Sequence, residues 1–377
     1  MADGAGSPVP YRRRTLVVSA LAFLALGGLV ALYGPLFPAL RERFGVGVDQ
    51  VGTVVSAHFV GSLAAVVVAG ELLRRLGYRP VLVAGAALLT AGLAGLVPAP
   101  TWTLFLASAG VAGVGFGLVQ VAVNLLVART FRGTAAPALN LINAVFGAGA
   151  VLSPVLVAAT SPRPAPVILT LTTLAALVLV AVATLKVVPV PPAARTEREP
   201  VPWGIVAAFV LLYFGYVSAE VGVTSWSTEH LTPTLGPAVG AAVPGVYWAT
   251  LTVGRLVAAA VTSRVRPGRV LTTGLAVAAL ALLGATYAPA APVLYGLVGL
   301  ALAPTFATGL AWLAEKLPQR AEQVSPAVFA AAAVGPIATA PLVGVALSRF
   351  GPAAVPTTLA ALAGLAFLSA VWLRRRR

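Results

Sequence analysis

A short proline-rich, charged segment interrupts an otherwise apolar chain at residues 188–202, which read VPVPPAARTEREPVP. The segment holds five prolines and four charged residues, and a stretch of this composition cannot continue a helix through a membrane. On both sides of it, long apolar runs alternate with short polar connections. We therefore interpret 188–202 as a linker between an N-terminal half, 1–187, and a C-terminal half, 203–377.

The composition indicates that a bilayer surrounds most of the chain. Of 377 residues, 59% are hydrophobic and 9% are charged, whereas soluble domains carry about 25% charged residues. So few charges cannot cover a water-exposed surface. The apolar run that follows Arg12–Arg14 is too long for a cleaved signal peptide, so we expect it to be the first membrane span.

The apolar runs predict an all-α integral membrane protein with two six-helix halves. A helix needs about 20 apolar residues, each rising ~1.5 Å, to cross a bilayer. Twelve runs are long enough, and they cover residues 15–38, 50–72, 80–98, 102–127, 137–160, 165–187, 203–227, 238–262, 269–288, 291–313, 323–346 and 352–373.

The basic residues predict the orientation of these spans. Of 25 lysines and arginines, 20 lie in every second gap or at the two termini, and 4 lie in the remaining gaps. Basic residues concentrate in cytoplasmic loops, so we expect both termini and the linker in the cytoplasm. Both ends on one side require an even number of spans, which agrees with twelve. We expect a multi-pass protein of the cell inner (plasma) membrane, and its Arg-rich composition is typical of a GC-rich bacterial genome.

Several kinds of chemistry are excluded by what the chain contains. The net charge of +15 is distributed over loops and forms no basic patch with interleaved aromatic residues, so no nucleic-acid partner is expected. The absence of cysteine excludes disulfides, thiol catalysis and zinc–thiolate sites. We expect no cofactor and no metal, and a monomer in the bilayer.

Glu220 is the carboxylate most clearly inside an apolar run, and we expect the other nine acidic residues in loops or at span ends. A charge at mid-span costs roughly 2.5–3.5 kcal/mol on insertion scales. Burial also favours the neutral form of a carboxyl group, which makes Glu220 the candidate for proton coupling. Two alternatives remain: a neighbouring hydroxyl or arginine holds it for helix packing, or it lies in water near the outer end.

Arg255 is the one basic residue inside an apolar run. Glu220 lies 17 residues after Trp203, whereas Arg255 lies 9 residues before Arg264. At ~1.5 Å per residue their depths differ by about 12 Å, so direct pairing would need an unwound helix. We favour a gate or packing role for Arg255 over a substrate ligand.

Four amides form pairs on single helix faces. Gln120 and Asn124 are four residues apart, and Asn140 and Asn143 are three apart. Amides both donate and accept hydrogen bonds, which suits sugar hydroxyls, so these residues are candidates for substrate binding. The alternative is hydrogen bonding between helices, which contributes about 0.6 kcal/mol on average in one membrane protein.

His58 and four aromatic residues are further candidates for substrate binding. Aromatic faces stack on pyranose rings, which favours Tyr33, Trp226, Tyr247 and Trp248. Aromatic residues near span ends also form the ordinary interfacial belt. His58 titrates near neutral pH when unperturbed, and its alternative role is a hydrogen bond between helices.

Glycine-rich runs lie in the fourth and fifth spans. The first is Gly113-Val114-Gly115-Phe116-Gly117, and the second is Gly147-Ala148-Gly149. Small residues let membrane helices approach closely, and we expect close packing at both. A nucleotide-binding role for the first run is rejected because it has no strand–helix context.

Two six-span halves joined by a cytoplasmic linker resemble the major facilitator superfamily. The loop after the second span resembles its signature at Gly70, Gly77 and Arg79, but Arg74 stands where the family has Asp. Glu71, one turn away, is a candidate substitute. The resemblance implies a gate or packing role for Glu71, Arg74, Gly77 and Arg79.

Shorter stretches resemble the fucose–galactose–glucose proton symporter family and related sugar permeases. They are Gln120 to Asn124, Asn140 to Gly149, Tyr216 to Glu220 with Trp226, and Gly254-Arg255. The chain departs from that family where Gln120 replaces a carboxylate and where the first span lacks acidic residues. The resemblance implies that Glu220 would act alone in coupling, or that transport is uncoupled.

These patterns favour a secondary active transporter that moves a small polar solute, a sugar, by alternating access with proton symport. The alternatives are a proton-antiport exporter of hydrophobic compounds or drugs, and an uncoupled facilitator. A membrane assembly or sensor protein would need an appended soluble domain. An enzyme is not expected, because no nucleophile motif accompanies His58 and Glu220.

Overall fold

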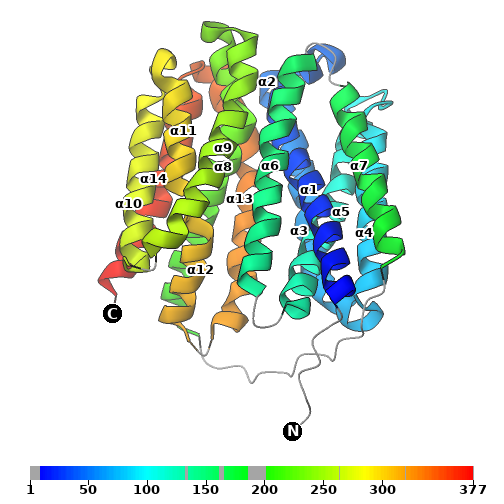
Figure 1. The fold of residues 1–377 in the computed structure, drawn as a ribbon. Helices are drawn as coiled ribbons and strands as arrows, with labels where there is room; N and C mark the ends of the chain where they lie inside the picture. The colour runs from blue at the N-terminus through cyan, green and yellow to red at the C-terminus, as the bar shows by residue number, and fades with distance from the viewer. Residues whose placement is uncertain are drawn as a thin grey trace. The chain divides into compact units, whose positions relative to one another are not determined.

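The computed structural model describes residues 9–131, 135–160, 165–185, 201–262, 264–318 and 320–376, and every regular element in them is a helix (Figure 1). The elements are α1 (Val9–Phe44), α2 (Val48–Val51), α3 (Thr53–Leu76), α4 (Tyr78–Leu96), α5 (Trp102–Thr130), α6 (Ala135–Thr160), α7 (Ala165–Ala183), α8 (Trp203–Leu235), α9 (Pro237–Thr262), α10 (Pro267–Gly284), the 3-10 turn η1 (Ala288–Ala290), α11 (Ala291–Leu302), α12 (Thr305–Lys316), α13 (Ala321–Phe350) and α14 (Ala354–Arg375).

The twelve predicted spans correspond to these helices in order. The second span is built from α2 and α3, and the tenth is built from α11 and α12, which meet at Pro304. Eleven helical segments of the described residues are long and apolar enough to cross a membrane, and α9, the predicted eighth span, is not among them. The all-helical membrane architecture is confirmed. The predicted linker falls outside the described residues except for Val201 and Pro202.

Two predicted spans end too early. α1 continues to Phe44 rather than residue 38, and α8 continues to Leu235 rather than residue 227. Arg41 and Glu229 break the apolar windows, but the backbone hydrogen bonds of each helix continue past them. Glu229, one of the nine acidic residues expected in loops or at span ends, lies near the end of α8 but is buried within the helix.

The chain divides into two compact units. Unit 1 comprises Met1–Val30, Val60–Ala150 and Ala165–Ala193, and unit 2 comprises Ala31–Phe59, Val151–Pro164 and Ala194–Arg377. The second part of α1, all of α2 and the start of α3 therefore belong to the same unit as α8 to α14.

Unit 1 is held together by backbone contacts at glycine. A Cβ atom added at Gly115 of α5 would lie 2.2 Å from the backbone nitrogen of Leu89 in α4. A Cβ atom added at Gly149 of α6 would lie 2.1 Å from the carbonyl oxygen of Leu24 in α1. The structure confirms the close helix approach expected at both glycine-rich runs.

Arginines connect several helix ends of unit 1. The guanidinium of Arg14 donates to Thr184 Oγ1 at 2.7 Å, and that of Arg79 donates to the Ala183 carbonyl at 2.5 Å. The Arg129 guanidinium lies 5.6 Å from the ring centroid of Tyr78. The starts of α1 and α4 and the ends of α5 and α7 therefore meet at one end of this unit.

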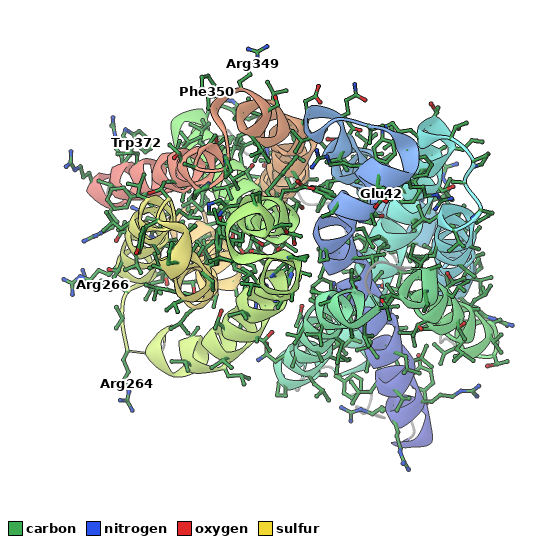
Figure 2. The ribbon with its side chains drawn as sticks, turned by 90° about the horizontal axis from the view of Figure 1, so that it is seen from above. Glu42, Arg264, Arg266, Arg349, Phe350 and Trp372 are labelled. Atoms are coloured by element: carbon green, nitrogen blue, oxygen red, sulfur yellow. The ribbon has the colours of Figure 1, made fainter. Side chains whose placement is uncertain are left out.

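Unit 2 shows the same gathering of basic residues. α10 packs against α11 and α14, and α8 packs against α9, α13 and α14 (Figure 1). Arg374 of α14 donates to Thr272 Oγ1 of α10 at 2.8 Å, and Lys316 of α12 donates to the carbonyl of Arg376. Figure 2 shows Arg264 and Arg266 projecting from the connection before α10. In each unit, basic residues from one set of the predicted gaps meet at a common end.

Candidate functional site

Glu220 lies at the middle of α8 with one carboxylate oxygen open. The Tyr216 hydroxyl, one turn earlier, donates a hydrogen bond to the carboxylate. The other oxygen, Oε2, is buried and has no hydrogen-bond partner among the described residues. One turn later, Thr224 Oγ1 donates to the Glu220 carbonyl at 3.1 Å. The carboxylate is thus partly satisfied by its own helix, and one acceptor remains for a proton or a solute hydroxyl.

α9 places a second open polar group near this carboxylate. Tyr247 is fully buried, and its hydroxyl has no hydrogen-bond partner in the part of the chain that the structure describes. The charges of Glu220 and Arg255 both act on Tyr247. We call Tyr216, Glu220, Tyr247 and Arg255 the Glu220 cluster.

Arg255 acts on Glu220 through its charge. None of the ion pairs described for this chain joins the two residues. Arg255 nevertheless lies close enough for its charge to act on the Glu220 carboxylate. The gate or packing role of Arg255 stays a prediction.

The predicted aromatic residues are buried in unit 2. Trp226, Tyr247 and Trp248 have exposed fractions of 0%, 0% and 2%, so they do not face the bilayer as an interfacial belt would. The Trp226 ring packs edge-on against Phe37 of α1, with 4.9 Å between ring centroids. Tyr247 and Trp248 pack edge-on against each other at 5.8 Å. These rings are interior residues, and a solute reaches them only where the packing opens.

His58 and Tyr33 form a buried pair between α3 and α1. The Tyr33 hydroxyl lies 3.3 Å from His58 Nδ1, and the ring centroids are 5.4 Å apart. The pair realises the hydrogen bond between helices that the sequence left as one alternative for His58.

The four amides lie in unit 1, and the side chains of Asn124 and Asn143 bond within their own helices. Asn124 Nδ2 donates to the Gln120 carbonyl at 2.9 Å, and Asn143 Nδ2 donates to the Leu139 carbonyl at 2.8 Å. Gln120 and Asn124 are partly exposed, and Asn140 and Asn143 are exposed. These described bonds do not link helices, so the alternative of helix–helix bonding receives no support from them.

The loop that resembles the superfamily signature is organised by Glu71. Its carboxylate accepts from Arg74 Nε at 2.8 Å and also accepts from Arg75. Gly77 starts α4 with a φ of +81°, a conformation that favours glycine. Arg74, which stands where the family has Asp, is thus paired within its own helix, and Glu71 is the acidic partner there.

Sequence reasoning missed an ion pair between α1 and α8. Arg41 Nη1 lies 2.8 Å from Glu229 Oε2, and the side chains are 39% and 8% exposed. The second oxygen, Oε1, is buried without a partner among the described residues. The adjacent His230 Nδ1 lies 2.9 Å from the Tyr295 hydroxyl. The sequence does hold a sign that α8 continues through Glu229. Hydroxyl-bearing residues precede Glu229, and no glycine or proline interrupts the helix until Pro233.

Many long apolar helices, an interior carboxylate and a partly buried interhelical ion pair define a polytopic membrane protein with a polar interior, the class to which transporters belong. The model of the Major Facilitator Superfamily matches residues 15–325. The chain belongs to this superfamily, and it is a transporter rather than an enzyme.

Curated relatives share part of the sequence. Sodium-dependent glucose transporter 1 of Rattus norvegicus is 29% identical over 142 residues, which cover 38% of this chain and 29% of the relative. Sodium-dependent glucose transporter 1A of Mus musculus is 27% identical over 135 residues, which cover 36% of this chain and 32% of the relative. The matched region spans about a third of each of these relatives.

Solved transporters share the fold over nearly the whole chain. The nucleoside transporter NupG has a TM-score of 0.79 at 12% identity, with 97% of this chain and 99% of that chain covered. A D-xylose-proton symporter has a TM-score of 0.76 at 13% identity, with coverage of 96% and 97%. The E. coli fucose:proton symporter has a TM-score of 0.65 at 18% identity, with coverage of 96% and 99%. At these identities the likeness is one of fold.

Proposed function

We propose that this chain is a secondary active transporter that takes up a sugar together with a proton by alternating access. Both termini and the linker lie in the cytoplasm, and the transporter is a monomer in the plasma membrane. The observation that carries the proposal is the carboxylate of Glu220 at the middle of α8, with Oε2 buried and unpartnered. This is the group that binds the coupled proton.

The Glu220 cluster gives the carboxylate two different environments. The charged form accepts from Tyr216 and is favoured by Arg255. The neutral form carries a hydroxyl that can donate to a solute oxygen or to Tyr247. A charged carboxylate is costly at a buried site without water. The proton therefore leaves Glu220 only when water reaches one side of the cluster. Proton release is thereby tied to the conformation of the transporter.

Sugar as the solute is supported by chemistry and by the relatives. The open groups are a carboxylate, a tyrosine hydroxyl and buried aromatic rings, which suit a ring that carries hydroxyls. The curated relatives are named as glucose transporters, and two of the solved structures are sugar–proton symporters. Tyr33, His58, Trp226, Tyr247, Trp248 and the four amides remain the proposed substrate residues.

Uptake into proteoliposomes tests the proposal. We expect concentrative uptake of labelled D-glucose, D-xylose or L-fucose when the outside is more acidic, with loss of accumulation after a protonophore is added. Glu220→Gln should still exchange sugar across the membrane without accumulating it. Glu42→Gln is the matched control, because Glu42 is exposed near the end of α1 and should accumulate normally.

Other results would assign another function. Equal accumulation by Glu220→Gln and the unmodified protein contradicts coupling through Glu220. Uptake that needs a sodium gradient and ignores the proton gradient assigns sodium as the coupled ion. Equilibration without accumulation identifies an uncoupled facilitator. Drug resistance on expression, with no sugar uptake, identifies the exporter of hydrophobic compounds.

A further inference from the structure

The part of α8 just before its last turn is buried although it is polar. Residues 221–231 are all buried. We call Thr224–His230 the polar stretch, because six of its seven residues are hydroxyl-bearing, acidic or imidazole side chains. Each residue of the polar stretch is at most 7% exposed. At the start of the same helix the buried residues are apolar, as at Val206, Phe209 and Leu212.

The polar stretch is enclosed by other helices of unit 2. On the α1 side, a Cβ atom added at Gly34 would lie 2.2 Å from the Thr224 carbonyl. Thr228 Oγ1 donates to the Gly240 carbonyl of α9 at 3.0 Å. His230 lies against Tyr295 of α11. These neighbours surround the helix and exclude water from it.

Three polar atoms of the polar stretch have no partner among the described residues. They are Trp226 Nε1, Ser227 Oγ and Glu229 Oε1, and all three are buried. A buried polar atom without a hydrogen bond costs about 1–3 kcal/mol. A helix that stayed buried throughout the transport cycle would gain stability from apolar residues at these positions. The composition of the polar stretch fits a helix surface that contacts water during part of the transport cycle.

We propose that the polar stretch lines a water-filled route from the outside to the Glu220 cluster, and that the Arg41–Glu229 ion pair is the latch that closes this route in the present structure. The proposal rests on the orientation and transport cycle given under Proposed function. The route starts at Arg41, which is partly exposed, and ends at Thr224, one turn above Glu220.

The latch has the chemistry that a reversible closure requires. Arg41 bonds only one of the Glu229 oxygens in the contact described here, so the pair is a single hydrogen bond reinforced by charge. The other two described ion pairs lie within α3 and separate no helices when broken. Removing the charge of Arg41 leaves Glu229 buried without a counter-charge, and this favours the conformation in which water reaches it.

A single-cysteine experiment tests the route, because the chain contains no cysteine. Ser227→Cys replaces a buried hydroxyl that makes no described hydrogen bond. Intact cells are treated from the outside with a membrane-impermeant maleimide. We expect slow labelling with Arg41 present and at least about tenfold faster labelling with Arg41→Gln, since tenfold corresponds to ~1.4 kcal/mol in the opening equilibrium. The charge-exchanged variant, Arg41→Glu with Glu229→Arg, should restore slow labelling.

Two control cysteines define the outcome. Ser348→Cys lies at the exposed end of α13, beside Arg349, which points outward in Figure 2, and should label equally in both backgrounds. Ser369 is buried in α14, and Ser369→Cys should remain unlabelled.

Equal labelling rates of Ser227→Cys with Arg41 and with Arg41→Gln overturn the proposal. A matching rise at Ser369→Cys also overturns it, because that rise would show unfolding. The measurement needs no solute, so a failure of sugar uptake does not affect it. Labelling that occurs only in inside-out vesicles overturns the outward route.

Discussion

Two carboxylates on one helix, Glu220 and Glu229, are held in different ways. Glu220 at the middle of α8 is bonded by a tyrosine hydroxyl of its own helix, whereas Glu229 near the end is bonded by an arginine of α1. The charge of Arg255 also acts on Glu220, so the two carboxylates differ in the group that bonds them: a hydroxyl of the same helix at Glu220 and a guanidinium of another helix at Glu229. This difference underlies the two proposals, which place proton exchange at the middle of the helix and closure near its end.

The largest expected effect separates the two carboxylates directly. Glu220→Gln should reduce sugar accumulation to the equilibrium level, because the coupled proton has no binding site. Glu229→Gln should keep coupled accumulation while its initial uptake rate changes, because the latch is weakened. Steady-state and initial-rate uptake of labelled sugar in proteoliposomes measure both. Loss of accumulation in both variants would contradict separate roles for Glu220 and Glu229.

Trp226 lies between the two carboxylates on α8, and its removal should be the largest change in stability. The ring is fully buried against Phe37 and lies close to Gly52 and Gly344. Trp226→Ala should cost about 3–5 kcal/mol, as is usual for a large buried ring, and should lower the melting temperature of the purified protein. Trp226→Phe is the milder control. An unchanged melting temperature for the alanine variant would contradict a packing role.

Removal of single hydroxyl groups tests the separate roles of Tyr247 and Tyr216 in the Glu220 cluster. The Tyr247 hydroxyl is unpartnered and is proposed to meet the solute, so Tyr247→Phe should raise KM about tenfold, or ~1.4 kcal/mol. Tyr216→Phe removes the hydrogen bond to Glu220 and should change the proton dependence of uptake more than KM for sugar. Indistinguishable kinetics of the two variants would mean that these hydroxyls do not have separate roles.

The smallest effect is expected at the amides of unit 1. The Asn143 amide donates to its own helix and is exposed, so Asn143→Ala should change stability by less than about 0.5 kcal/mol. If Asn143 binds sugar as proposed, KM nevertheless rises. Thermal unfolding and uptake kinetics on the same preparation test both parts. A large drop in melting temperature with unchanged KM would indicate a structural amide.

The spans could be predicted from the sequence because each helix must bury its own backbone hydrogen bonds in the bilayer. Length and apolar content therefore located the helices without any tertiary information. The same reasoning ended α1 and α8 too early, since Arg41 and Glu229 look like loop residues when each is considered alone. The burial of Glu229 depends on Arg41, a partner 188 positions away in the chain, which hydropathy along the sequence cannot detect.

The candidate site was predictable in part. Glu220 stands out as an acidic residue in an apolar run, and its bond with Tyr216 follows from spacing of one helical turn. Burial of Trp226, Tyr247 and Trp248 does not follow from their sequence positions near span ends, because the same positions suit an interfacial belt. Which hydroxyls would remain unpartnered depends on the packing of α8 against α1 and α9.

Gly34, Gly52 and Gly344 have a consequence for capturing the transporter in a chosen form. At each of them an added Cβ atom would lie within 2.8 Å of a neighbouring backbone or ring atom, so even alanine is a wedge in the present conformation. In the proposed outward-open form, where these helices separate, the same methyl group would meet no obstacle. Alanine at these three positions is thus expected to favour that form for crystallography or cryo-microscopy without changing any polar side chain.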